Sequence, residues 1–403
     1  MSCTAAAGTP AFARINRAML AGGFSAFALL YCVQPLMPQM ARQFALTPAQ
    51  ASWSLSIATL TLALSLILSG ALSERIGRKK MMAGAVTGAA LFTLLSAFAH
   101  NFIELLVLRA LLGFALGGMP AVAMAYLSEE VEPRSLGLAM GIYIGGSALG
   151  GMAGRLVVSV ISDFYSWRLA MALIGAAGFY AAWEFWRSLP ASRNFRSGKS
   201  GLPALLCGVR AHLRDAGLPW LFALAFLLMG VFVSMYNYIG YRLLAAPFGL
   251  GQSAVGAFSV LYLIGIFSAV WAGRLADRLG RRNVLWIVMA LMLAGLLLTL
   301  SNALPVIAAG MALFTFGFFA THSVASSWVG MRARAPQALA SAMYLFFYYL
   351  GSSMVGSLCG VVWSGAGWPG VVGLLALALG LAFLIALHLR GLAPLPAPLP
   401  AAA

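Results

Sequence analysis

Apolar residues run through this chain in long blocks that short polar segments separate. Each block holds roughly 20 consecutive residues with few or no charges, and that length lets a helix cross the ~30 Å hydrocarbon core of a bilayer. The pattern predicts about twelve membrane-spanning segments. They lie near residues 18–38, 51–72, 80–99, 103–126, 138–160, 168–187, 218–240, 254–273, 284–301, 305–328, 338–361 and 368–389.

The composition supports the same class of protein. The chain is 62% hydrophobic and 8% charged, with a mean hydropathy of +0.94. Because backbone polar groups in lipid must be satisfied internally, such blocks form helices and not open sheets. We therefore expect an all-α membrane protein.

One short polar loop occurs twice. The segment GALSERIGRK, from Gly70 to Lys79, recurs about half a chain later as GRLADRLGRR, from Gly273 to Arg282. Each copy separates two apolar blocks. A duplicated bundle of helices is the build of a secondary transporter, so the repeat predicts 12 transmembrane helices arranged as two pseudo-symmetric six-helix bundles.

A polar stretch from Arg187 to Asp215 divides the two halves. Within it, Leu202 to Leu213 has helical periodicity and is expected to lie on the membrane surface. The predicted organisation is a cytoplasmic arm (1–17), a first bundle (18–187), a cytoplasmic linker (188–217), a second bundle (218–390) and a disordered tail (391–403).

The basic residues indicate how the chain is oriented. With both termini in the cytoplasm, most of the 25 lysines and arginines fall on cytoplasmic loops, as the positive-inside rule requires. The net charge of +16 is then explained by anchors beside anionic headgroups, and no nucleic-acid partner is indicated. We expect a multi-pass monomer in a bacterial-type cytoplasmic (inner) membrane.

The four cysteines and four histidines are scattered along the chain. Their spacing fits neither a disulfide framework nor a metal site. No metal or cofactor is expected. The sequence also lacks a Ser/His/Asp, HExxH or paired-carboxylate constellation, so it does not indicate an enzyme.

With its two loops and twelve segments, the chain resembles the major facilitator superfamily from about residue 18 to residue 390. The family's signature loop, G-x-L-[SA]-[DE]-R-x-G-R-[KR], is present in both halves. The resemblance implies alternating access, with the loops steadying one of two states. The implied hinge residues are Gly70, Glu74, Arg75, Gly77, Arg78, Gly273, Asp277, Arg278, Gly280 and Arg281.

The fourth segment carries Leu105-x3-Arg109-x3-Gly113-x3-Gly117, which resembles the family's second motif. A lone arginine inside the membrane needs a partner or a wet cavity. The resemblance implies that Arg109 takes part in proton coupling. The alternative is an arginine that snorkels outward near the outer surface.

The fifth segment is rich in glycine and reads Gly146-x3-Gly150-Gly151-x2-Gly154-Arg155. Proton-driven drug exporters of the superfamily carry G-x3-G-P-x2-G-G here. In this chain glycine replaces the proline and Arg155 replaces the last glycine. Small residues at this spacing still allow close helix packing, and the pattern looks more like the branch labelled arabinose efflux permeases.

The tenth segment contains His322 beside Thr321 and Ser326. Its unperturbed pKa near 6.5 would allow protonation in the physiological range, so His322 is either a proton or substrate contact or a hydrogen-bonded packing group. None of the nine acidic residues lies in the middle of a predicted segment. The other expected proton-coupling residues are therefore Arg109, Glu104 and Glu130.

In the family, segments one, four, seven and ten line the central path. An aromatic, weakly charged cavity suits amphipathic or uncharged solutes, whereas two embedded arginines would attract an anion. The expected cavity residues are Tyr31, Gln34, Arg109, Arg155, Asn237, Tyr238, His322, Ser326 and Tyr348.

Two functions follow from this resemblance. The first is proton-driven export of a small organic solute, drug or sugar-like, by alternating access. The alternative is an importer or exchanger of organic anions that uses Arg109 and Arg155. In either case the partners are a small-molecule substrate, protons and the lipid bilayer.

Overall fold

The computed structural model describes residues 4–192, 194, 202–333 and 337–392, which are almost entirely helical. In chain order the elements are α1 (Pro10–Tyr31), η1 (Gln34–Leu36), α2 (Met37–Gln43), α3 (Pro48–Ile76), α4 (Arg78–Ser96), α5 (Phe102–Leu116), α6 (Pro120–Glu130), α7 (Pro133–Phe164), α8 (Trp167–Ser188), α9 (Leu202–Leu213), α10 (Leu218–Leu244), α11 (Gln252–Ala257), η2 (Phe258–Leu261), α12 (Tyr262–Leu279), α13 (Arg281–Leu298), α14 (Leu304–Arg332) and α15 (Gln337–Gly391).

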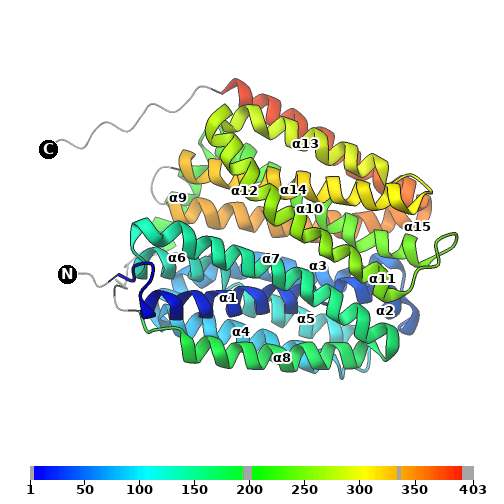
Figure 1. Ribbon diagram of the computed structural model, residues 1–403, viewed down its shortest axis with the longest axis horizontal. Coiled ribbons are helices and arrows are strands. Elements are labelled where there is room, and N and C mark those ends of the chain that lie inside the picture. The colour runs from blue at the N-terminus through cyan, green and yellow to red at the C-terminus, as the bar shows by residue number, and fades with distance from the viewer. Residues whose placement is uncertain (1–3, 193, 195–201, 334–336, 393–403) are drawn as a thin grey trace.

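The helices form two bundles that lie side by side (Figure 1). The N-terminal bundle comprises α1 to α8, and the C-terminal bundle comprises α10 to α15. The predicted all-α fold with two six-helix bundles is confirmed. The cytoplasmic placement of the arm and linker stays a prediction, and residues 393–403 of the predicted tail lie outside the described residues.

Twelve crossings account for the predicted segments. Within the described residues, 10 apolar helical stretches are long enough to cross a membrane. The helix α4 adds one, with Arg78, Lys79 and Lys80 at its start. The last stretch adds another because α15 is interrupted at Gly367, where φ is +58° and ψ is −152°. The chain turns back there, between the two predicted final segments.

Three crossings are interrupted within the described residues, and one of them passes from α11 through η2 into α12. The first is interrupted where α1 ends at Tyr31, and the chain passes through η1 with Pro35 at its second position. Proline cannot donate a backbone hydrogen bond and bends a helix, which accounts for this break. The second break separates α5 from α6, between Leu116 and Pro120.

Side-chain caps fix several helix starts. The hydroxyl of Thr47 accepts from the backbone N–H of Gln50 at the start of α3, and the Gln50 side chain accepts from the Thr47 backbone in return. This capping box satisfies donors that the first helical turn leaves without partners. Asn101 and Ser166 cap α5 and α8 in the simpler way.

The two bundles meet at one end of the molecule, which we call the closed end. It carries α2, the start of α3 and α11, and it lies opposite the start of α1 and α9 (Figure 1). Here the hydroxyl of Ser357 on α15 donates to that of Ser56 on α3 at 3.1 Å. Gly360 packs directly on Ala49, so closely that an added Cβ would overlap it. Small residues let the two backbones approach.

Candidate substrate site between the bundles

A chain of hydrogen bonds crosses from one bundle to the other through Gln34. The Nε of Arg155 on α7 donates to Gln34 Oε1 at 2.5 Å, and Gln34 Nε2 donates to Asn237 Oδ1 on α10 at 2.6 Å. All three side chains are buried. The break after α1 places Gln34 in η1, where its side chain can reach both bundles. The structure thus brings three of the predicted cavity residues into one polar layer.

Arg155 is held between aromatic rings. Its guanidinium carbon lies 4.3 Å from the ring centroid of Tyr31 and 4.8 Å from that of Tyr262. Its Nη1 also donates to Gly151 O, one turn earlier on α7, at 2.6 Å. Aromatic faces attract a cation through their quadrupole. Tyr262, which starts α12, was missed in the sequence because its segment is not one that lines the family's central path.

A small cavity lies beside this polar layer. It has a volume of about 30 Å³, which is room for about one water molecule. Arg155 is the charged residue in its wall, and the rest of the wall comes from both bundles and is largely apolar. The lining residues are Gln34, Pro35, Pro38, Arg155, Tyr236, Asn237, Ile239, Gly240, Leu243, Val255, Gly256, Phe258, Ser259 and Met311.

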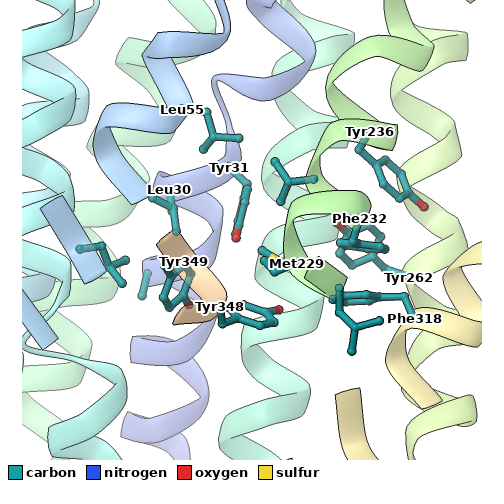
Figure 2. Packing of buried hydrophobic residues seen from close by; sticks show 14 of the residues in the cluster. Leu30, Tyr31, Leu55, Met229, Phe232, Tyr236, Tyr262, Phe318, Tyr348 and Tyr349 are labelled. Atoms are coloured by element: carbon teal, nitrogen blue, oxygen red, sulfur yellow. The ribbon is translucent and has the colours of Figure 1, made fainter. Parts of the chain in front are cut away.

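An aromatic cluster continues from Arg155 into the C-terminal bundle. Phe232 on α10 stacks on Phe318 of α14 with centroids 3.7 Å apart, and Tyr236 meets Tyr262 edge-on at 5.3 Å. Figure 2 shows these rings gathered between the helices together with Tyr348 and Met229. The cluster gives the inter-bundle space one apolar, polarisable wall.

His322 lies at the far side of this cluster. Its Nδ1 is 3.0 Å from the hydroxyl of Tyr344, and its ring centroid is 4.9 Å from that of Tyr348. The ring also stacks parallel to Phe318. Its hydrogen-bond partner is therefore a tyrosine of α15, and not the Thr321 or Ser326 that neighbour it in sequence. Ser326 donates to the Ser323 carbonyl of its own helix at 3.2 Å.

Arg109 is fully buried, but it does not reach this layer. Its Nε donates to Ser54 O at 3.0 Å, its Nη1 donates to Leu29 O at 3.1 Å, and its Nη2 donates to Leu30 O. Leu29 and Leu30 belong to the last turn of α1, where carbonyls lack partners and the helix dipole favours a cation. Arg109 thus satisfies carbonyl groups that the break in the first crossing leaves without helical partners.

Three other predicted residues also lie away from the cavity. Tyr238 donates to Gly356 O at 2.7 Å in the interface with α15. Glu104 is exposed at the start of α5, where it accepts from the His100 backbone at 2.8 Å. Glu130 ends α6 and accepts from the backbone N–H of Asn194 at 2.8 Å.

The first repeated loop is tied to its own bundle. Gly77 joins α3 to α4 with a φ of +94°, a conformation that glycine adopts without strain. Arg78 pairs with Glu129 of α6 at 2.8 Å and donates to Ser73. Gly70 and Glu74 lie in the last turns of α3, and the Arg75 side chain is exposed.

The second loop repeats this geometry. Gly280 joins α12 to α13 with a φ of +85°. Arg281 pairs with Asp277 at 2.9 Å and donates to Ser327 of α14 at 3.0 Å. Gly273 is half-buried within α12, and the Arg278 side chain is exposed. Both loops lie at the end of the molecule opposite the closed end.

Comparisons with known proteins agree with this geometry. A family model described as the Major Facilitator Superfamily matches residues 19–354. The chain is 47% identical to an uncharacterized MFS-type transporter, YybF, of Bacillus subtilis over 95% of this chain and 94% of that protein. It is 48% identical to the inner membrane transport protein YnfM of Escherichia coli over 95% of this chain and 92% of that protein.

A solved structure shares the fold at low sequence identity. It is a bacterial homolog of the human lysosomal transporter Spinster in an inward-facing and occupied conformation. It is 14% identical, covers 95% of this chain and 96% of its own, and superposes with a TM-score of 0.75.

Proposed function

Because the chain belongs to the major facilitator superfamily, we propose that this membrane transporter exports a small organic solute by alternating access, driven by protons. The observation that carries the proposal is that Gln34, Arg155 and Asn237 form a buried polar layer shared by the two bundles. A central site whose groups come from both halves is where rocking bundles can bind and release a solute.

The two ends of the molecule support this cycle. At the closed end, contacts such as Ser56 with Ser357 join the bundles. At the other end, the pairs Arg78–Glu129 and Asp277–Arg281 each stay inside one bundle. With both termini in the cytoplasm, the closed end faces outward. We propose that the repeated loops engage the opposite bundle in the other state.

His322 is the proton-carrying residue in this proposal. It is a titratable side chain within a membrane-spanning helix, and its described neighbours are tyrosines and a phenylalanine that cannot neutralise it at ordinary pH. Glu104 and Glu130 lie at helix ends away from the aromatic cluster. The guanidinium nitrogens of Arg109 already donate to backbone carbonyls. These three residues are therefore weaker candidates.

A second candidate function is import or exchange of an organic anion. It is favoured by Arg155, because no carboxylate among the described residues lies within ion-pair distance of this buried cation. This candidate shares the site and the alternating-access cycle with the first. It differs in the charge of the solute and in the mode of transport, which is import or exchange.

Flux through purified protein in proteoliposomes tests the proposal. A pH-sensitive dye inside the vesicles reports proton movement while sugars, cationic drugs and organic acids are added in turn. Cysteines replacing Ser56 and Ser357, in a background without the four native cysteines, allow the closed end to be cross-linked, and the single Ser56→Cys variant is the matched control.

We expect proton movement opposite to one solute class, abolished by cross-linking and restored by reduction. Flux that survives complete cross-linking would exclude alternating access about this end. Solute movement without a pH change would exclude proton coupling, and protons that move with the solute would favour the importer.

A further inference from the structure

We infer that the substrate of the central site is a small organic monocarboxylate whose carboxylate group binds Arg155. This inference rests on the second candidate function, transport of an organic anion, and narrows its solute class. The starting observation is a charge imbalance. Arg155 is 3% exposed, and none of the nine acidic residues, all of which lie in the described part of the chain, is within 4.0 Å of it.

The second buried arginine shows what a compensated cation looks like here. Arg109 places Nε, Nη1 and Nη2 on three carbonyl oxygens, two of them at the negative end of α1. Arg155 has one carbonyl, the neutral amide of Gln34 and two aromatic faces. A buried cation held by neutral groups is poised for an anionic partner. Because the site has one uncompensated positive charge, we expect its ligand to carry one negative charge.

Further hydrogen-bonding groups next to Arg155 have no partner. The amide nitrogen of Asn237 and the hydroxyl of Tyr31 are buried, and no described residue bonds them. Asn237 is 2% exposed and Tyr31 is 3% exposed. Buried donors are nearly always satisfied in folded proteins. A ligand with acceptor oxygens in the cavity would satisfy the amide nitrogen of Asn237, which lines it.

The rest of the wall describes the surroundings of the ligand's charged group. The cavity is only about 30 Å³ in this state, so the bundles have to part before the body of a ligand can enter. Beyond Arg155, the polar lining residues are Gln34, Asn237 and Ser259, and the others are apolar, aromatic or glycine. A sugar would need many more polar partners. A cationic drug would meet the charge of Arg155. A planar carboxylate, in contrast, fits the fork of a guanidinium through two parallel hydrogen bonds.

Gln34 connects occupancy of the site to the contact between the bundles. A carboxylate bound to the guanidinium competes with Gln34 Oε1 for Arg155 Nε. The same side chain donates to Asn237 Oδ1 and to Val233 O of the C-terminal bundle. A ligand that displaces Gln34 from Arg155 therefore frees a side chain that also bonds the other bundle.

Binding of matched probes to the purified full-length protein tests this inference. We would measure thermal stabilisation and calorimetric affinity for benzoate, butyrate, benzamide and benzylamine. Benzamide keeps the shape of benzoate without its charge, and benzylamine reverses the charge. The inference requires that a carboxylate bind and that benzamide and benzylamine bind at least about 30-fold more weakly.

Variants locate the site. Arg155→Gln is expected to weaken carboxylate binding at least about 30-fold, and Arg155→Lys is expected to weaken it less because the charge is kept. The matched control, Arg42→Gln, removes the same charge from an exposed position at the closed end and is expected to leave the affinity unchanged.

Equal binding of benzoate and benzamide, or unchanged binding in Arg155→Gln, would overturn the inference. The comparison in the unaltered protein decides the matter even if Arg155→Gln fails to fold. A carboxylate that binds but is not transported would leave the site standing and refute the transport function. Transport of another solute without carboxylate binding would do the reverse.

Discussion

The carboxylate of Asp163, in the last turn of α7, caps the backbone N–H of Gln252 at the start of α11. The oxygen–nitrogen distance is 3.2 Å, and the second carboxylate oxygen accepts from Ser253 N at 3.0 Å. The acid and the capped helix belong to different bundles. A carboxylate cap normally satisfies the free N–H groups at the start of a helix. Here the cap also joins the two bundles.

Removing this cap is expected to open the closed end more often. Asp163→Ala leaves two helix-start donors without an acceptor, which costs about 1 kcal/mol, or roughly a five-fold shift in the opening equilibrium. Asp163→Asn keeps one good acceptor and should shift it less. The measurement is the rate at which a maleimide labels Ser357→Cys in a background without native cysteines. Equal rates in all three proteins would show that Asp163 does not hold this end.

Arg109 is expected to be required for the fold. Its replacement by alanine leaves three buried carbonyls unmet, and we expect a loss of about 3–5 kcal/mol in the free energy of unfolding. Lysine keeps the charge but lacks the planar fork that reaches all three oxygens, so Arg109→Lys should also melt earlier in detergent. A stable lysine variant with an altered pH profile of transport would instead favour the proton-coupling role.

His322 is expected to set the pH dependence of transport. Glutamine can keep a hydrogen bond to Tyr344 but does not titrate, so His322→Gln should fold and lose the part of the pH dependence of flux that the histidine supplies. His388→Gln, at the end of α15 beside Trp220, is the control. If the His322→Gln flux follows the same pH profile as the unaltered protein, the histidine is a packing residue.

Asp215 is expected to stabilise the protein at neutral pH and not in acid. Burial raises the pKa of this carboxyl, but hydrogen bonds from Arg332 and from the N–H groups of Gly217 and Leu218 lower the pKa below its usual value. A carboxylate with a depressed folded pKa stabilises the fold above its unfolded pKa, near 3.9, and loses that effect as the pH falls through the folded pKa.

Thermal melting of Asp215→Asn against the unaltered protein measures this effect. The variant should melt earlier at about pH 7, and the gap should shrink below about pH 4. Asp277→Asn is the control, because its carboxylate is 67% exposed in a pair with Arg281 and exposed pairs contribute little. A gap of constant size across this range would contradict the assignment.

Hydrophobic block length was sufficient to predict the crossings, since lipid forces every long apolar run into a helix. The bend at Pro35 and the separation of the last two crossings around Gly367 followed from local chemistry. The hydrogen-bond partners of the buried polar groups could not be predicted from local chemistry. Arg109 and Arg155 look alike in sequence, yet one meets carbonyls of α1 and the other meets rings of both bundles.

Asp163 was missed for the same reason. An acid in the last turn of a helix opposes the dipole of its own helix, and this was the available signal that its partner lies elsewhere. The N–H groups that it binds lie 89 and 90 residues further along the chain, in the other bundle. Such a contact depends on how two bundles dock, which local patterns do not encode.

The packing of Gly360 on Ala49 has a mechanical consequence. At this contact Gly360 rests on the backbone of Ala49, with the Tyr238 hydroxyl beside it, so the movement of one side chain would not open the seal. The two helices that form this contact have to separate together. Permeation past this point therefore requires the bundles to separate as whole bodies. A single bulky side chain at residue 360 would hold the two bundles apart.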